Sequence, residues 1–344
     1  MNIDQLCASV PLFAGLDADD LRFVLRAAQQ IEYATGSRIV QQGQAADCAL
    51  FIERGYAQVV SALPGGGQTV MAELGPGSVL GEMALLEGGV RSADVIAREP
   101  TACLSMERDA FRMLIAQGNR TVQTINHRIT QTLCQRLREL NGKILAMSES
   151  EPLAPAIAQT AAQRQPCHFN VHAFLRLLPS LRQISAAELD ALLRVSQIFD
   201  LPRGAALFNA GQAADACYIV LRGALEISRN QAGSHKRIGI LGPGRVCGLL
   251  ALIEAQPHSM SATARESVTL LELPRAAFEQ FYFGDTRATL KIQQVINQEL
   301  LQSLARTNNH LVRLISQARI RNHAQHVREL SRALAAQDIR TGIS

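Results

Sequence analysis

The chain has 344 residues, more than the roughly 100–200 of a typical domain, and its hydrophobic content of 47% suffices for two packed cores. Its net charge of +4 is too small to indicate nucleic-acid binding by itself. No apolar run approaches the roughly 20 residues that span a bilayer, and residues 1–4 do not begin a signal peptide, so we expect a cytoplasmic protein without a membrane span.

The sequence pattern of the first half of the chain predicts a helix, then short strands, then a long helix. Asp17 is a predicted helix cap, and Leu21, Val24 and Leu25 follow on one helical face. Short alternating runs between glycine turns come next and predict a sandwich or jelly-roll barrel. A long closing helix is indicated by apolar residues every three or four positions: Ile125, Ile129, Leu133, Leu137, Leu140 and Ile144.

The second half repeats this pattern. Residues 43–47 recur letter for letter as residues 211–215, at an offset of 168, and residues 74–77 recur as 241–244 at an offset of 167. Its opening helix carries the capping box Ser185-x-x-Glu188. Its closing helix is indicated by Ile296, Leu300, Leu304, Leu311 and Ile315, and we expect it to end near Gln317.

The predicted fold is therefore mainly β with flanking α-helices, two tandem jelly-roll (β-roll) domains each followed by a long α-helix. The long helices predict pairing within the chain, as a pseudo-dimer, or between two chains. We expect a first domain with its closing helix at 1–147, a linker at 148–168, a second domain with its closing helix at 169–317, and an arginine-rich C-terminal helix at 318–344.

Residues 81–93 read Gly-Glu-Met-Ala-Leu-Leu-Glu-Gly-Gly-Val-Arg-Ser-Ala. This segment resembles the phosphate-binding cassette of cyclic-nucleotide-binding domains, found in the Crp/Fnr-like catabolite activator family and in kinase regulatory subunits. The family pattern is Gly-Glu-x-Ala/Gly-Leu, a short loop, then Arg-Ala/Ser/Thr-Ala. The resemblance covers nearly all of residues 10–145 and, in weaker form, 175–315. It implies a bacterial cAMP-binding protein with tandem domains.

The chemistry of a cyclic phosphate explains these residue types. Arg91 offers a planar donor fork for the phosphate oxygens, and the carboxylate of Glu82 can accept from the ribose 2′-hydroxyl. Gly81 lets the backbone approach closely. Further donors are expected from the backbone of Met83, Ala84, Ser92 and Ala93. The alternative is an internal ion pair between Glu82 and Arg91 in a barrel that binds nothing.

The base must be recognised elsewhere, and the resemblance points to Asn141 on the first closing helix. An amide at this position suits adenine but can turn to face guanine, so cAMP is favoured and cGMP stays open.

The second cassette is damaged at both charged positions. Leu249 stands where the first copy has Glu82, and His258 stands where it has Arg91. Histidine is shorter than arginine, cannot form the fork, and is mostly neutral at pH 7. We therefore expect no nucleotide in the second copy, which would serve as a scaffold or interaction module.

The sequence says less about the partner that this protein would regulate. Residues 301–344 hold seven arginines and two acids, but they show a single helical pattern and no helix-turn-helix. We therefore expect a signal-transducing, second-messenger receptor that regulates an unidentified protein partner when its first closing helix moves. DNA is not the expected partner, although a nucleic-acid regulator acting through these arginines is the rival hypothesis, and a ligand-free scaffold is the third.

No catalytic or metal-binding pattern accompanies the cassette. The sequence shows no nucleophile elbow, no H-E-x-x-H and no Walker A motif, and the seven cysteines are scattered without a C-x-x-C spacing. We expect no enzymatic activity and no metal.

Overall fold

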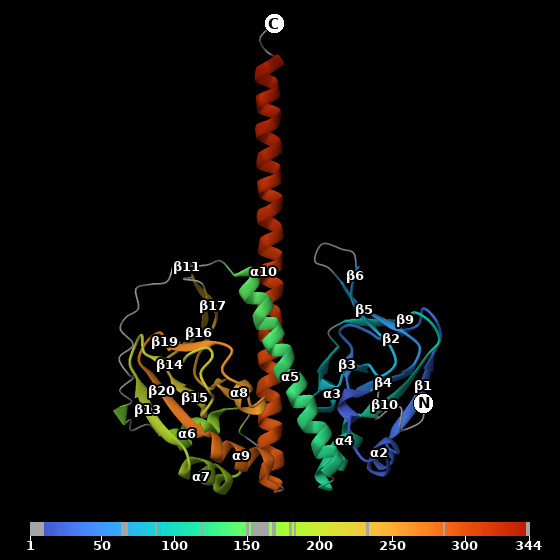
Figure 1. Ribbon diagram of the computed structural model, residues 1–344, viewed down its shortest axis with the longest axis vertical. Coiled ribbons are helices and arrows are strands. Elements are labelled where there is room, and N and C mark those ends of the chain that lie inside the picture. The colour runs from blue at the N-terminus through green and yellow to red at the C-terminus, as the bar shows by residue number, and fades with distance from the viewer. Residues whose placement is uncertain are drawn as a thin grey trace.

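The computed structural model describes residues 10–62, 68–86, 88–91, 93–118, 120–148, 151–152, 165–166, 170–178, 181, 184–231, 234–284 and 286–341. It is mainly β with flanking helices, and two barrels lie on either side of a pair of long helices (Figure 1). Within the described ranges, no helix combines the length and apolarity of a membrane crossing. No group of three His, Cys, Asp or Glu side chains in these ranges is placed to hold a metal ion.

The first barrel consists of two four-stranded antiparallel sheets, in the orders β1-β10-β4-β7 and β2-β9-β5-β6, and a small β3-β8 pair. Its strands are β1 (Ala28–Tyr33), β2 (Arg38–Val40), β3 (Ala45–Ala46), β4 (Cys48–Arg54), β5 (Ala57–Ala62), β6 (Gln68–Leu74), β7 (Val79–Leu80), β8 (Gly89–Val90), β9 (Asp94–Ala97) and β10 (Thr101–Glu107). Its helices are η1 (Pro11–Phe13), α2 (Ala18–Leu25), α3 (Met83–Leu86), α4 (Arg108–Ala116) and α5 (Arg120–Met147).

The second barrel repeats this strand order, as β13-β20-β15-β18 and β14-β19-β16-β17. Its strands are β13 (Gln197–Leu201), β14 (Ala206–Phe208), β15 (Ala216–Arg222), β16 (Leu225–Gln231), β17 (Ser234–Leu241), β18 (Val246–Cys247), β19 (Ser261–Ala264) and β20 (Val268–Pro274). Its helices are α6 (Val171–Leu177), α7 (Ala186–Arg194), α8 (Leu249–Ile253), α9 (Arg275–Phe283) and α10 (Arg287–Thr341).

The predicted linker contributes to the second barrel. Two short strands, β11 (Glu151–Pro152) and β12 (Gln165–Pro166), pair with β17 and β13 at the edges of its two sheets. An edge strand has unpaired backbone groups that a passing segment can satisfy, which composition alone does not reveal.

The caps expected for the two opening helices are present. The Asp17 side chain accepts from the backbone N–H groups of Asp19 and Asp20 at the start of α2. At the start of α7, Ser185 and Glu188 form the reciprocal capping box. These local hydrogen bonds depend on short sequence spacing, which explains why the sequence sufficed to predict them.

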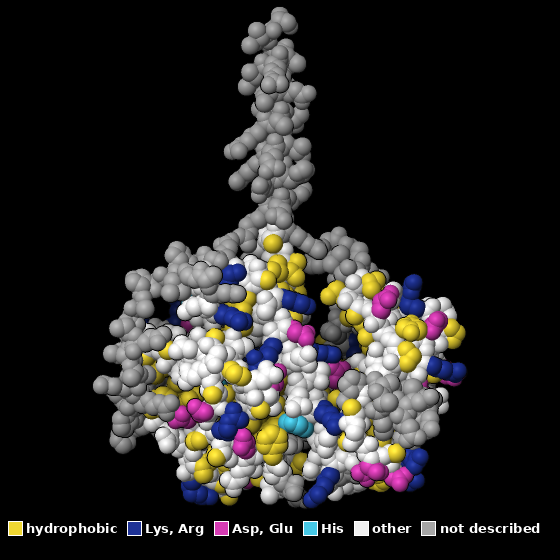
Figure 2. Space-filling model, in the orientation of Figure 1, with side chains coloured by type: hydrophobic (Ala, Val, Ile, Leu, Met, Phe, Trp, Pro, Cys, Tyr) yellow, Lys and Arg dark blue, Asp and Glu magenta, His cyan; other side chains and the backbone are white. Residues whose placement is uncertain are grey.

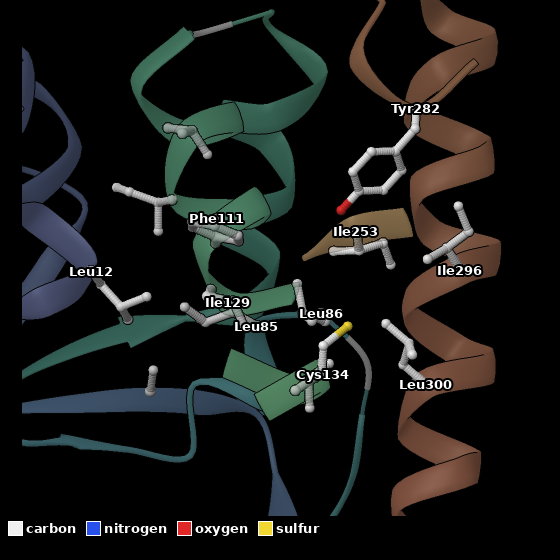
Figure 3. Packing of buried hydrophobic residues seen from close by; sticks show 14 of the residues in the cluster. Leu12, Leu85, Leu86, Phe111, Ile129, Cys134, Ile253, Tyr282, Ile296 and Leu300 are labelled. Carbon is white, nitrogen blue, oxygen red and sulfur yellow. The ribbon is translucent and has the colours of Figure 1, made fainter. Parts of the chain in front are cut away.

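Helix α5 packs on the first barrel and on α10 at once. Its apolar face shares one core with α3 and α4 on one side and with α10 on the other. In Figure 3, Ile129 of α5 lies beside Leu85 of α3, and Cys134 of α5 lies between Leu85 and Leu300 of α10. The buried stripe of α5 is wide enough to contact the barrel and α10 at the same time.

The contact between α5 and α10 joins equivalent positions of the two copies. Asn126 Nδ2 donates to Gln293 Oε1 at 3.2 Å, and Thr130 Oγ1 donates to Asn297 Oδ1 at 2.8 Å. Both pairs are separated by 167 residues, the offset of the duplication. A two-fold interface brings equivalent residues together in this way, so the helices pack within the chain as a pseudo-two-fold pair.

Helix α10 continues without a break from Arg287 to Thr341, and its last turns project beyond both barrels (Figure 1). The predicted end near Gln317 and the separate helix at 318–344 were therefore wrong. No glycine or proline occurs in the helical residues, so nothing in the backbone interrupts the helix.

Candidate functional site

The first cassette lies between β7 and β9, with α3 and β8 between them. Gly81 has φ +66°, in the left-handed region that favours glycine. A Cβ atom at this position would lie 2.0 Å from Arg91 Nη1. Gly81 therefore lets the Arg91 side chain cross this turn, which gives the predicted glycine a specific structural reason.

Arg91 is held by backbone and side-chain hydrogen bonds. Its backbone N–H donates to Gln44 O at 2.8 Å, and its carbonyl accepts from Gly43 N at 2.9 Å. Its Nη2 donates to Cys48 O at 2.8 Å and to Cys48 Sγ at 3.2 Å. No described carboxylate lies within ion-pair distance of the guanidinium. A positioned cation without a counter-charge is suited to an anion.

Glu82 is buried, with 3% of its surface exposed, and it faces α5 rather than Arg91. Its Oε1 lies 2.8 Å from Arg136 Nη2, within ion-pair distance but without hydrogen-bond geometry. The Glu82–Arg91 ion pair considered from the sequence does not form; Arg136 takes the place of Arg91. A buried carboxylate oxygen that lacks a hydrogen bond is costly, and a hydroxyl donor would relieve that cost.

These residues surround a cavity of about 670 Å³, called here the first cavity. Its size falls within the roughly 300–1,000 Å³ typical of small-molecule sites. The predicted residues Gly81, Glu82, Met83, Ala84, Arg91 and Ala93 all line it. Ser92 lies outside the described residues.

Four lining residues come from the long helices, and the sequence analysis missed them. Arg136 belongs to α5, and Leu301, Gln302 and Ala305 belong to α10, the closing helix of the other copy. Arg136 lies next to the apolar stripe of α5 and carried no distinguishing pattern. The α10 residues are about 200 positions away in the chain, and only the pairing of the long helices brings them to the first cavity.

Asn141 does not line the first cavity. It lines a smaller cavity at the second barrel, of about 250 Å³, called here the second cavity. Helix α5 has 28 residues and is therefore about 42 Å long, so its last turns lie against the other barrel. The expected base contact from Asn141 to the first site was wrong for this reason.

The second cassette keeps the backbone of the first. Gly248 has φ +82°, and His258 N donates to Gln212 O at 2.9 Å while His258 O accepts from Gly211 N at 2.7 Å. These bonds are equivalent to those of Arg91 with residues 43 and 44. The duplication therefore preserves the turn while its side chains differ.

The two side chains that replace Glu82 and Arg91 in the second cassette are buried. The His258 ring stacks on Phe208 with centroids 3.7 Å apart and planes 8° from parallel, and burial lowers the pKa of His258. Leu249 is 3% exposed and belongs to the core shared with α5 and α10. The second copy thus lacks both the guanidinium and the carboxylate of the first.

Comparisons with known proteins agree with the duplicated architecture. The family model described as "Cyclic nucleotide-binding domain" matches residues 30–118 and 198–285, together just over half of the chain. A cAMP-dependent protein kinase regulatory subunit of Yarrowia lipolytica is 24% identical over 78% of this chain and 58% of its own length. A cyclic AMP receptor protein of Thermus thermophilus is 32% identical over 41% of this chain and 63% of its own length. The chain thus matches less than two thirds of either relative.

Among solved structures, the cAMP-bound regulatory domain of Toxoplasma gondii PKA aligns with 88% of this chain and 96% of its own, at 18% identity and a TM-score of 0.33. Because the family model matches twice, once on each barrel, the chain belongs to the cyclic nucleotide-binding domain family and carries two copies of that domain.

Proposed function

We propose that this chain is a non-catalytic receptor that binds one cyclic nucleotide, with cAMP favoured, in the first cavity. The observation that carries the proposal is that one cavity is lined both by Arg91, which has no described counter-charge, and by the buried carboxylate of Glu82. A cyclic nucleotide presents a phosphate anion and a ribose hydroxyl, which match these two groups. The names of the relatives, which refer to cAMP, support this nucleotide class.

The ion pair between Glu82 and Arg136 offers a route from ligand to helix. A ribose hydroxyl that donates to Glu82 would compete with the Arg136 guanidinium of α5 for the same carboxylate. The other end of α5 packs on the second barrel, where Ile144 and Leu145 share a core with Ile238 and Met260. A ligand shifts an equilibrium only through contacts that differ between two states, and this ion pair is such a contact.

We propose a protein as the partner that senses this change. Helix α5 lies between the two barrels, so its movement would alter the relation of the second barrel and α10 to the first. On the face in Figure 2, Lys and Arg side chains of the described residues are interspersed with Asp and Glu. Arg306 is one of the arginines on which the nucleic-acid hypothesis depends, and it forms an ion pair with Glu299 at 3.0 Å.

Calorimetric titration of the full chain with cAMP, cGMP and cyclic di-GMP tests the ligand and its stoichiometry. We expect one nucleotide per chain, with cAMP the tightest. Two equal sites per chain, or no binding of any of the three, would contradict the proposal. Binding of cGMP ten times tighter than cAMP would reverse the assignment of the base.

Hydrogen exchange tests the signalling route. On addition of cAMP we expect slower exchange in residues 79–93 and along residues 125–145, because the ligand would order the cassette and α5 together. The last turns of α5, from Leu140 onward, pack on the second barrel and α10. Slower exchange there, beyond Arg136, therefore reports transmission. Protection confined to the cassette would mean that the first copy binds nucleotide without signalling through α5.

A further inference from the structure

The second cavity differs in chemistry from the first. Its volume is about 250 Å³, against about 670 Å³. The barrel side is largely apolar, and the helix side is formed by both long helices. The barrel side includes Phe208, Ile227, Ile238 and Met260, and the helix side includes Arg138 of α5 and Arg306 of α10.

Each arginine that lines the cavity already contacts a carboxylate, although Glu299 is shared between Arg306 and Arg245. Arg138 forms an ion pair with Glu254, whose side chain is 10% exposed, and Arg306 pairs with Glu299 at 3.0 Å. No other Lys or Arg of the described chain lines the cavity. His258, in the place of Arg91, is buried against Phe208. A phosphate placed here would meet no arginine that lacks a carboxylate contact, so its charge would be less well compensated than beside Arg91.

The size and the aromatic wall indicate what would fit instead. An apolar cavity of about 150 Å³ accommodates benzene, so about 250 Å³ has room for two fused rings. Phe208 and His258 both line the cavity as a face-to-face stack, against which an aromatic ring can pack.

One polar atom adds a requirement. Arg138 Nη2 is buried and has no hydrogen-bond acceptor among the described residues. A buried donor without an acceptor is unfavourable, and a ring nitrogen or carbonyl oxygen on a ligand would satisfy it.

We propose that the second cavity binds a small uncharged heteroaromatic compound of two fused rings that carries a hydrogen-bond acceptor. The ligand would pack between the second barrel and the long helices, and the Arg138 side chain would donate to its acceptor. This site is independent of the nucleotide proposed for the first cavity.

Three probes of equal ring size test the proposal by ligand-observed NMR titration of the full chain: indole, 7-azaindole and indole-3-carboxylate. All contain the same fused bicycle, but only 7-azaindole is both uncharged and equipped with a ring acceptor. We expect 7-azaindole to bind about tenfold tighter than indole, the equivalent of one hydrogen bond, and the anion to bind weakest. Equal or tighter binding of the anion, or no binding of 7-azaindole, would overturn the proposal.

A blocking variant locates the site. Gly239 lines the cavity, and a Cβ there would meet no atom within 4 Å, so Gly239→Leu has room for its side chain. Gly242→Leu is the matched control, since its Cβ is equally unobstructed and it does not line the cavity. We expect only Gly239→Leu to abolish 7-azaindole binding, with cAMP titration unchanged in both. Should Gly239→Leu fail to fold, Ser303→Phe blocks the cavity from α10; retained 7-azaindole binding in a folded blocking variant refutes the assignment.

Discussion

The two barrels share a backbone and differ in what their cassettes hold. Both have the same strand order, and both begin the cassette with a glycine in the left-handed region. The residue that follows the cassette loop makes the same pair of backbone hydrogen bonds in each copy. In the first copy that residue is Arg91, which lacks a described counter-charge; in the second it is His258, stacked on Phe208. The comparison teaches that the turn depends on backbone geometry, whereas the ligand chemistry depends on two side chains.

The neighbouring position shows the same divergence. Glu82 is an acidic side chain buried against Arg136 of α5, while its equivalent Leu249 belongs to the hydrophobic core. At this position the first copy therefore contacts a long helix through charge, and the second through apolar packing. The Glu82 contact can respond directly to a polar ligand group that competes for the carboxylate.

The largest expected effect tests whether the two copies form one folding unit. Leu133 and Leu300 are equivalent residues, 0% and 1% exposed, in a core that spans both copies. We expect Leu133→Ala and Leu300→Ala each to lower the free energy of unfolding by about 2–5 kcal/mol, because each leaves a cavity in the shared core. Urea unfolding followed by circular dichroism measures this loss.

Val312→Ala is the control for that measurement, because Val312 lies on α10 and is 44% exposed. It should cost less than about 0.5 kcal/mol. Two separate unfolding transitions, with Leu300→Ala affecting only one, would show that the barrels are independent despite the common core.

The next effect separates the two cassettes. Arg91→Ala removes a charged donor from the first cavity, and we expect cyclic nucleotide affinity to fall by about 10–150-fold, from about 1.5–3 kcal/mol for a bond to a charged group. His258→Ala, at the equivalent position, should leave that affinity within about twofold. Calorimetric titration measures both. Equal losses in the two variants would show that the nucleotide is not bound by the first cassette alone.

The smallest effect is the part of the pH dependence of stability that the second cassette contributes. Burial lowers the pKa of His258 below its ordinary value of about 6.5. The unfolded chain therefore takes up the proton first as pH falls, so stability is full above about pH 6.5 and declines below it. Burial also lowers the pKa of His127, and that share of the decline is common to all variants.

In His258→Phe the aromatic stack on Phe208 is kept and the titration is removed. We expect the loss of unfolding free energy between pH 7.5 and 5.5 to be smaller than in the wild type by up to about 1 kcal/mol. Arg91→Ala should keep the wild-type slope, because arginine does not titrate in this range. A steeper decline in His258→Phe would contradict the direction of the shift.

The sequence by itself determined the features that depend on local spacing. The two helix caps, the barrel strands and the first cassette from Gly81 to Ala93 are each encoded within a short stretch of sequence. Periodicity and turn residues act at this range, and the same holds for the replacement of Arg91 by His258. The duplication is visible as the same letters repeated 167 or 168 residues later.

Tertiary structure decided what the long helices do. Nothing in residues 120–147 says that Arg136 contacts Glu82 while Asn141, five positions later, lies at the other barrel. That division follows from the length of α5 and from the pairing of Asn126 with Gln293 and Thr130 with Asn297. A helix presents several faces, and which partner each face contacts is fixed only when segments far apart in the chain pack together.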